Sequence, residues 1–223
     1  MGDTHRSYIP AAGRDWLLPL YDPLQHLLIR EGVKRILLDD AIIGPDQRVL
    51  DVGCGTGTLT ILLQQLHPQA EVVGLDPDLK ALAIAKTKSE KAGVAINFVR
   101  GFADEIPYPP ESFDRVLSSF MFHHLTPDEK LGTLRDVSRV LRPGGSLHLL
   151  DFGRPRSPYS SLLARLLHRG QNLRDNIEGR IPSLMRESGL AESAEVAHRS
   201  TVFGTVSCYR AIQPGAESLV GAA

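Results

Sequence analysis

Apolar residues recur along this chain with two different periods. Short apolar runs, typical of buried strands, alternate with longer stretches in which apolar residues return every three or four positions, as in helices. The apolar runs lie at 49–52, 71–75, 95–99, 114–119 and 146–150. The helical stretches between them lie at 59–66, 78–93 and 126–141. This alternation predicts a mostly parallel β-sheet with helices on both faces, wound in two halves.

Local signals set the limits of several of these elements. Asp78 is placed to cap the second helical stretch, which Gly93 then ends. Residues 126–129, Thr-Pro-Asp-Glu, form a capping box with proline at the first helical position. Residues 142–145, Arg-Pro-Gly-Gly, predict a turn before the strand at 146–150.

The flanking segments predict further elements. The first 47 residues contain two short helical patterns, and Asp22 can cap the first of them. Leucines interspersed with basic residues predict an inserted amphipathic helix within 154–177. The remaining expected elements are a helix at 178–188, ended by Gly189, and two strands at 195–200 and 206–212.

Polar and ionisable residues stand at or just after the carboxyl ends of the expected strands. In a parallel sheet these ends meet at one edge, and ligands bind there at the point where the strand order reverses. The residues concerned are Asp51, Asp76, Asp104, His123, His124 and Asp151. We therefore expect the functional site at this edge.

The first expected strand runs directly into the glycine-rich stretch VLDVGCGTGT (49–58). A strand, a glycine loop and a helix in this order expose backbone N–H groups and let a ligand approach the main chain closely. The glycines stand at 53, 55 and 57, whereas a dinucleotide fingerprint would need a glycine at 58, where Thr58 is found. No Gly-Lys-Ser/Thr follows, so the phosphate-loop pattern is also absent.

Three carboxylates indicate a nucleoside-like ligand without a pyrophosphate. Asp76 lies 23 residues after Gly53, a separation at which an acidic side chain can accept hydrogen bonds from both ribose hydroxyls. Asp104 could accept a hydrogen bond from an adenine amino group, and Asp51 favours a cation near the loop. A ligand that combines adenine, ribose, an ammonium group and a sulfonium fits this pattern: S-adenosylmethionine.

Each of these carboxylates also has a structural interpretation. Asp76 could cap the following helix, although Asp78 already occupies that position. Asp104 could be a solvated turn residue in a proline-rich loop. Asp51 could hold the glycine turn together by bonding to loop amides.

Four segments, in this order and at this spacing, carry a resemblance to a known family. They are VLDVGCGTG (49–57), VVGLDPD (72–78), FADEIPYPPESFDRV (102–116) and LRPGGSLHLLDFG (141–153). Over about residues 48–153 the chain resembles the class I S-adenosylmethionine-dependent methyltransferases. ESFDRV, LRPGG and LLDFGRP resemble the branch that includes the ubiquinone and menaquinone biosynthesis C-methyltransferases, whose relatives also methylate other small molecules and phospholipids.

The resemblance implies a fold and a set of cofactor contacts. The fold is a Rossmann-like, doubly wound, mostly parallel seven-stranded sheet that ends in an antiparallel hairpin, in one domain over 1–223. Its parts would be the amino-terminal helices (1–47), the cofactor-binding core (48–153), an inserted helix or lid (154–177), and the last helix and hairpin (178–213). The implied contacts are Gly53, Gly55 and Gly57 around the methionine part, Asp51 near its ammonium group, Asp76 at the ribose, Asp104 at the adenine amine, and Pro77, Asp78, Phe102 and Ala103 beside the adenine ring.

Composition narrows the classes of partner. The chain has 223 residues, of which 42% are hydrophobic, and its 25 basic and 26 acidic side chains leave no basic excess for nucleic acid. The amino-methylating NPPY-type motif is also absent, because SSFMFHH stands after the fourth strand. Neither a membrane span nor a secretory signal is visible, so we expect a cytoplasmic protein. The 160–170 helix has three interpretations: a lid, a transient membrane contact or a core-packing helix.

Methyl transfer chiefly requires placement of the acceptor behind the methyl group. A general base is needed only where the acceptor must lose a proton, and His123 or His124, with Asp151, is the candidate. Adjacent histidines seldom point together and no third ligand is at hand, so no metal site is expected. The acceptor is expected to be a small molecule, such as a quinone precursor or another hydrophobic metabolite, methylated at carbon, oxygen or nitrogen. The alternatives are a non-catalytic cofactor-binding protein and, less favoured by the glycine pattern, a nicotinamide-dependent oxidoreductase; the oligomeric state is left open.

Overall fold

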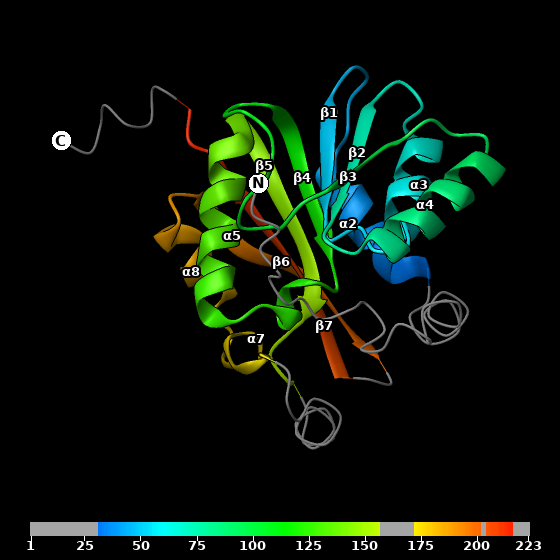
Figure 1. Ribbon diagram of the computed structural model, residues 1–223. Coiled ribbons are helices and arrows are strands. Elements are labelled where there is room, and N and C mark those ends of the chain that lie inside the picture. Colours follow the sequence, from blue (N-terminus) through cyan, green and yellow to red (C-terminus); the bar gives the residue numbers. More distant parts are fainter. Residues whose placement is uncertain (1–30, 157–171, 202–203, 216–223) are drawn as a thin grey trace.

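The computed structural model describes residues 31–156, 172–201 and 204–215, which form one seven-stranded sheet covered by helices (Figure 1). The strands are β1 (Arg48–Val52), β2 (Glu71–Asp76), β3 (Asn97–Arg100), β4 (Phe113–Ser119), β5 (Leu141–Phe152), β6 (Ala191–Thr201) and β7 (Gly204–Ile212). The helices are α2 (Glu31–Ala41), α3 (Thr58–Leu66), α4 (Leu79–Lys91), α5 (Pro127–Val140), α7 (Arg174–Glu178) and α8 (Ile181–Glu187), with a 3₁₀ turn η2 (Phe122–His124).

The strand order, β3-β2-β1-β4-β5-β7-β6, confirms the doubly wound sheet. β1 pairs in parallel with both β2 and β4, so the direction of winding reverses between β1 and β4. β7 runs antiparallel to both β5 and β6, which confirms the carboxyl-terminal hairpin. Crossover helices after β1, β2 and β4 therefore begin at the same edge of the sheet, the edge at which the polar residues were expected.

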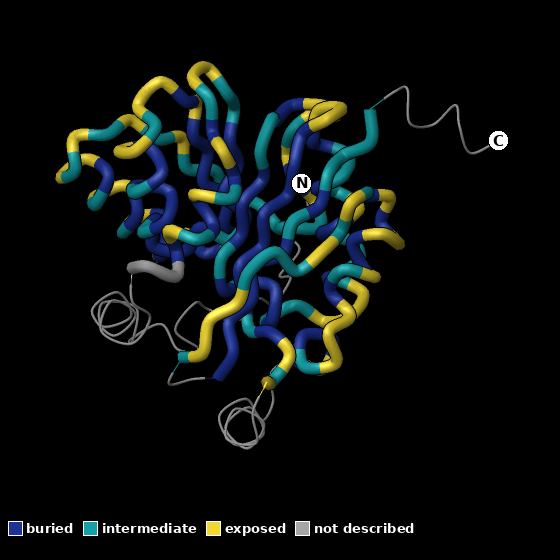
Figure 2. The backbone as a smooth tube through the Cα atoms, turned by 180° about the vertical axis from the view of Figure 1, so that it is seen from behind, coloured by how far each residue is buried: buried dark blue, intermediate teal, exposed yellow. Residues whose placement is uncertain are grey.

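The core lies on both faces of the sheet, because consecutive strand residues point to opposite sides. Val49 and Leu117 pack with α2 and α3, whereas the adjacent Leu50 and Val116 pack with α5 and α8. Both clusters are almost fully buried, and Figure 2 shows the strands as a buried centre with the exposed backbone outside it. This two-sided burial explains why the central strands β1, β2 and β4 carry apolar residues at consecutive positions.

The helix signals read from the sequence are present. The carboxylate of Asp78 accepts a hydrogen bond from the Lys80 amide at the start of α4. Thr126 and Glu129 form the expected reciprocal capping box at the start of α5. Both helices start at the carboxyl edge of the sheet, so these caps fix where the loops that line the site turn into helices.

Two expectations were wrong in detail. Residues 142–145 belong to β5 instead of a separate turn, although the β4–β5 register shifts across them and Gly144 has a φ of +76°. Hydrogen bonds between Gly144, Gly145 and Gln213 keep this irregular segment in the sheet. The helix expected at 178–188 is α8, which begins only at Ile181. Gly179 adopts a left-handed φ of +72° that ends α7, a separate short helix that lies mostly in the segment where the inserted helix was expected.

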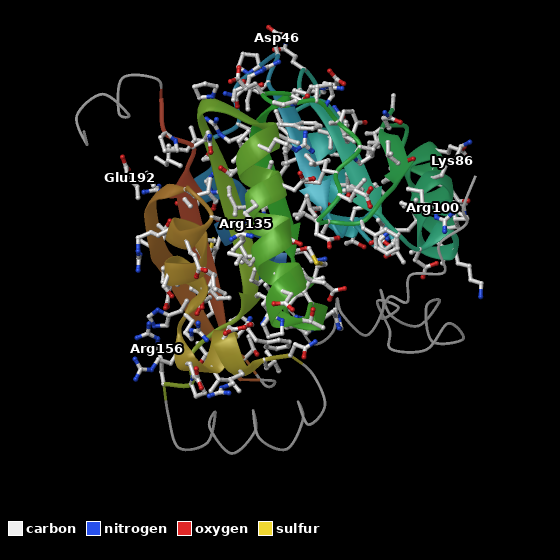
Figure 3. The ribbon with its side chains drawn as sticks, turned by 60° about the vertical axis from the view of Figure 1, so that its left-hand side comes forward. Asp46, Lys86, Arg100, Arg135, Arg156 and Glu192 are labelled. Carbon is white, nitrogen blue, oxygen red and sulfur yellow. The ribbon has the colours of Figure 1, made fainter. Side chains whose placement is uncertain are left out.

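Parts of two expectations lie outside the described residues. These are the helix capped by Asp22 and the amphipathic leucine-rich stretch at 160–170. None of the helices within the described ranges is both long and apolar enough to cross a membrane. Figure 3 shows Asp46, which precedes β1, and Arg156, which follows β5, at opposite ends of the sheet. The candidate site lies at the edge formed by the carboxyl ends of the parallel strands.

Candidate active site

A cavity of about 360 Å³ opens at the carboxyl ends of β1, β2 and β4, where the strand order reverses. Its walls come from the loops that follow β1, β2, β3 and β4, with additional side chains from α2, α5 and the segment before α7. The residues that line it include Lys34, Gly53, Gly55, Asp76, Pro77, Asp78, Phe102, Ala103, Asp104, Phe120, Met121, His124, Glu129 and Asn172. Its size falls within the ~300–1,000 Å³ range of small-molecule sites.

The glycine loop forms one wall of this cavity. Its first amides, those of Gly53 and Cys54, both donate to the Leu75 carbonyl at 2.8 and 3.0 Å, which ties the loop to the end of β2. Gly53, Gly55 and Gly57 all have positive φ values, of 72°, 53° and 75°. A Cβ atom at Gly53 would lie 2.3 Å from Cγ of Met121, so a side chain there would also collide with the opposite wall. The loop therefore needs glycine for its backbone and for the space beside it.

Asp76 is fixed at the end of β2 by the backbone of two neighbouring loops. Oδ2 accepts the Gly55 amide at 2.8 Å, and Oδ1 accepts the Asp78 amide at 2.9 Å. Burial raises the pKa of Asp76 to about 6, against the opposing effect of these two hydrogen bonds. Each carboxylate oxygen has two acceptor positions, so Asp76 retains capacity for hydroxyl donors of a ligand.

Asp51 lies behind the glycine loop and is not one of the residues that line the cavity. Its side chain is 1% exposed, and Oδ2 accepts the hydroxyl of Thr60 at 2.7 Å. Oδ1 has no hydrogen-bond partner among the described residues. Burial raises the pKa of Asp51 to about 6, while the Thr60 hydroxyl and the charge of Lys34 oppose the shift. A buried, unsatisfied acceptor beside a ligand cavity suits a cationic ligand group, reached directly or through water.

The residues expected around adenine meet at one end of the cavity. Pro77 comes from the loop after β2, and Phe102, Ala103 and Asp104 come from the loop after β3. The Phe102 carbonyl accepts the Glu105 amide at 3.2 Å, which closes a tight turn around Ala103 and Asp104. The structure thus brings together apolar surface and a carboxylate acceptor, as an adenine ring would require.

The two histidines occupy different positions. His124 lines the cavity, and its Nδ1 is buried without a hydrogen-bond partner in the described part of the chain. Burial, and then the charge of His123, lowers the pKa of His124 to about 4. The imidazole is therefore neutral near pH 7 and can accept a proton.

His123 and Asp151 lie behind His124 and do not line the cavity. Asp151 Oδ1 is 2.7 Å from His123 Nδ1, and its Oδ2 accepts the His123 amide at 3.0 Å. Burial alone would raise the pKa of Asp151, but the charge and hydrogen bond of His123, with backbone amides, hold it below its ordinary value. The two histidine ring centroids are 4.0 Å apart, so this buried pair supports the ring of His124 from behind.

Several cavity residues carried no recognisable signal in the sequence. Lys34 reaches the cavity from α2, Glu129 from α5, and Asn172 from the segment before α7. Asn172 also donates from Nδ2 to the His124 carbonyl at 3.3 Å. Phe120 has a φ of +53°, an uncommon backbone for an aromatic residue, directly after β4. Strained backbone of this kind clusters at functional sites, but it is visible only in the structure.

Comparison with known proteins agrees with this arrangement. The family model described as "Methyltransferase domain" matches residues 49–145. The chain is 37% identical over 153 residues to a demethylmenaquinone methyltransferase from Deinococcus radiodurans, an alignment that covers 67% of this chain and 63% of that protein. It is 36% identical over 153 residues to a demethylmenaquinone methyltransferase from Thermus thermophilus, which covers 67% of this chain and 69% of that protein.

A solved structure extends the likeness in fold beyond the aligned core. Phosphoethanolamine N-methyltransferase 2 of Haemonchus contortus, in complex with phosphomonomethylethanolamine and S-adenosylhomocysteine, superposes with a TM-score of 0.76 at 16% identity. The superposition covers 94% of this chain and 60% of that chain.

The strand order and the glycine-lined cavity define a Rossmann-like methyltransferase domain. The chain belongs to the S-adenosylmethionine-dependent methyltransferases, in the branch of the demethylmenaquinone methyltransferases and ubiquinone/menaquinone biosynthesis C-methyltransferases. The matched segment leaves out over a third of the Deinococcus protein.

Proposed function

We propose that the protein transfers a methyl group from S-adenosylmethionine to a ring carbon of a small hydrophobic acceptor of the hydroquinone type. One observation carries the proposal: a single cavity joins the carboxylate of Asp76 and the glycine loop to the neutral imidazole of His124. Curated relatives named as demethylmenaquinone and ubiquinone/menaquinone C-methyltransferases support this acceptor class and the choice of carbon.

The cavity fits the cofactor on three observations. Gly53 lines the cavity without a side chain, so a ligand can approach the main chain of the loop closely. Near the loop, Asp51 holds a buried acceptor atom that has no partner within the described part of the chain, which suits an ammonium group. Asp76 is a fixed, buried carboxylate at the end of β2, which suits two ribose hydroxyls. On this proposal Phe102, Ala103 and Pro77 flank the adenine ring, and Asp104 accepts a hydrogen bond from the adenine amino group.

S-adenosylmethionine, when bound, supplies an electrophilic methyl group. The protein's main contribution is to place the acceptor carbon in line with that group and to exclude water, which can supply on the order of 7–11 kcal/mol. His124 takes the proton of an acceptor hydroxyl, which makes the neighbouring ring carbon nucleophilic. His123 and Asp151 are positioning residues, because His123 contacts the ring of His124, Asp151 bonds His123, and neither lines the cavity. After methylation the ring carbon loses its proton to solvent, and His124 returns the proton it took to the acceptor oxygen.

A labelling experiment tests the function. The purified protein is incubated with methyl-labelled S-adenosylmethionine and a reduced, short-chain demethylmenaquinone analogue, and the products are separated and identified. We expect label on the naphthoquinol ring carbon. His124→Ala should lower kcat about 10²–10⁴-fold, with the affinity for S-adenosylhomocysteine changed by less than about threefold. His198→Ala, at an exposed histidine of β6, is the matched control and should leave both quantities unchanged.

Two outcomes would contradict the proposal. Binding of S-adenosylhomocysteine without label on the quinol, or on any component of a lipid extract, would favour the non-catalytic binding protein. Normal turnover by both His124→Ala and His123→Ala would remove the general base from the mechanism.

A further inference from the structure

A second cavity opens near the carboxyl end of β5, beside the carboxyl-terminal hairpin. Its volume is about 480 Å³, and none of its described lining residues also lines the cofactor cavity. It lies between the segment after β5, the turn that joins α7 to α8, and strands β6 and β7. One of its residues is Arg156, which Figure 3 shows at the far end of the sheet from Asp46. The volume falls in the ~300–1,000 Å³ range of ligand sites, and the proposed methyl transfer does not use this cavity.

Two arginines give this cavity an excess of positive charge. Arg154 and Arg156 line it, and Glu195 is the single carboxylate among its described lining residues. Nη2 of Arg156 is 2.8 Å from Oε1 of Glu195, so these two charges compensate each other. Arg154 takes part in no ion pair within the described part of the chain. The second cavity therefore has one guanidinium group whose charge is not compensated by a described side chain.

The backbone on both sides of Arg154 is well defined. Pro155 restricts the chain between the two arginines. Gly179, with a φ of +72°, brings the main chain close to Arg154, because a Cβ atom there would lie 3.7 Å from Cδ of Arg154. Nδ2 of Asn176 donates to the Phe152 carbonyl at 2.9 Å, which fastens α7 to the end of β5. A cavity whose walls are already in place loses less freedom when it binds a ligand.

Tyr209 adds a hydroxyl group at the buried side of the cavity. Its side chain is 1% exposed, and its hydroxyl makes no hydrogen bond to a described residue. Burial raises the pKa of Tyr209 well above its ordinary value, so the phenol keeps its proton at neutral pH. The nearby Ser207 hydroxyl opposes part of this shift, but it donates its own proton to Glu195 at 3.3 Å. A buried hydroxyl proton of this kind is stabilised by an acceptor atom of a ligand.

We propose that this second cavity binds the phosphate group of a phosphorylated ligand, with Arg154 and the Tyr209 hydroxyl as donors. A guanidinium group presents paired N–H groups that match two oxygens of a phosphate, and a phenol can donate to a third. A phosphate alone fills only part of about 480 Å³, so the ligand also carries an organic remainder, which Pro155 and Pro182 contact. Two sources offer this chemistry: a soluble phosphate ester and the headgroup of a phospholipid.

A merely basic surface makes a different prediction from a built site. If Arg154 were one surface charge among many, the loss of another exposed arginine would weaken anion binding to the same extent. Arg135 of α5 is exposed, does not line the cavity and is labelled in Figure 3. Arg135→Gln is therefore the matched control for Arg154→Gln, because both remove one guanidinium charge.

Two binding measurements test the site and distinguish its sources. Calorimetry with glycerol 3-phosphate measures the soluble arm. Co-sedimentation with phosphatidylcholine vesicles, with and without phosphatidic acid, measures the lipid arm, since phosphatidic acid carries the same phosphate monoester in a bilayer. Each measurement is repeated with saturating S-adenosylhomocysteine, which should leave anion binding unchanged because the two cavities are separate.

The variants should change anion binding by different amounts and in different directions. Arg154→Gln should weaken it by at least about tenfold. Tyr209→Phe keeps the ring and removes the hydroxyl, so it should weaken binding by about threefold to tenfold. Glu195→Gln should strengthen binding by about threefold, because it removes the carboxylate that competes for Arg156. Arg135→Gln should change binding by less than about twofold.

The outcomes separate the sources and the two proposals. Binding of glycerol 3-phosphate that depends on Arg154 assigns the site to a soluble ester, and binding of only the phosphatidic acid vesicles assigns it to a lipid headgroup. No binding in either arm, an equal loss in Arg154→Gln and Arg135→Gln, or displacement by S-adenosylhomocysteine would overturn the inference. If anion binding holds but S-adenosylhomocysteine does not bind, the proposed function alone is contradicted. Thermal unfolding of each variant shows whether it is folded.

Discussion

Gly53 combines two constraints at the first residue after β1. Its φ of +72° disfavours any L side chain, and Met121 packs so close that a Cβ atom at Gly53 would collide with Cγ of Met121. Gly93, at the end of α4, shares the first constraint with a φ of +68°, but a Cβ there would have no atom within 4 Å. A comparison of the two glycines therefore separates the cost of the backbone conformation from the cost of a collision with Met121 in the cavity wall.

Gly53→Ala should weaken S-adenosylhomocysteine binding by at least about tenfold, because the new methyl group displaces Met121 or the loop. Gly93→Ala should cost about 1–2 kcal/mol of stability from the left-handed backbone alone and leave the affinity unchanged. Calorimetric titration and urea unfolding of both variants measure these effects. Equal affinities in the two variants would show that the space beside Gly53 does not serve the ligand.

Asp76 links ligand affinity to pH. Burial raises its pKa to about 6 in the ligand-free protein, whereas the ionised carboxylate is the form that accepts two hydroxyl donors. Affinity for S-adenosylhomocysteine should therefore fall about tenfold from pH 7 to pH 5. The sign for stability is the opposite: protonation of Asp76 stabilises the ligand-free fold as the pH falls from about 6 towards 3.8. Calorimetric titrations with S-adenosylhomocysteine at pH 7, 6 and 5 test the expected fall in affinity. Asp76→Asn should bind this ligand weakly at pH 7, and its affinity should depend less on pH. An affinity of the wild-type protein that rises on acidification would contradict the role of Asp76.

At the scale of elements, a buried lysine of α5 connects α5 to α7 and to the segment before α7. Lys130 is 0% exposed, and its Nζ lies 3.2 Å from Asp175 Oδ2 and 3.3 Å from Asn176 Oδ1, both on α7. Nζ also donates to the Asn172 carbonyl, and the Asn172 amide donates to the carbonyl of His124. Packing of α7 against α5 thus supports the turn that presents His124 to the cavity.

Lys130→Met should destabilise the protein by about 3 kcal/mol. The value lies at the lower end of the cost of breaking a buried ion pair, because Arg180 still contacts Asp175 at 3.1 Å. Lys91→Met, at an exposed lysine in the last turn of α4, should change stability by less than about 0.5 kcal/mol. Urea unfolding at pH 7 measures both, and equal midpoints would mean that the Lys130 cluster does not stabilise the fold.

At the scale of the whole molecule, much of the fold was predictable because each signal is local. Apolar runs, the Thr126 capping box and the glycine loop each depend on neighbouring residues, and their order implies the winding of the sheet. The grouping of Asp76, Asp104 and His124 at one edge also follows, since the carboxyl ends of parallel strands meet there. The antiparallel hairpin of β6 and β7 was predicted from the family resemblance and not from a local signal.

The remaining features depend on contacts between distant segments. His123 and His124 are adjacent in sequence and their rings are in contact, but only His124 lines the cavity, whereas Asp151 of β5 bonds His123 behind it. The sequence does not reveal this difference. Lys34 reaches the cavity only because α2 packs across the sheet, 19 positions before the glycine loop begins. The break between α7 and α8 depends on Gly179, which a helical pattern tolerates until its backbone conformation is known.

The central claim is that the cavity beside Gly53 and Asp76 holds an adenosyl sulfonium donor, and its most direct test is a pair of calorimetric titrations on the wild-type protein. We expect S-adenosylmethionine and S-adenosylhomocysteine to bind one site per chain, Asp76→Asn to weaken both, and NADH not to compete with them. Tight binding of NADH by the folded protein, with no heat from either adenosyl ligand, would contradict it.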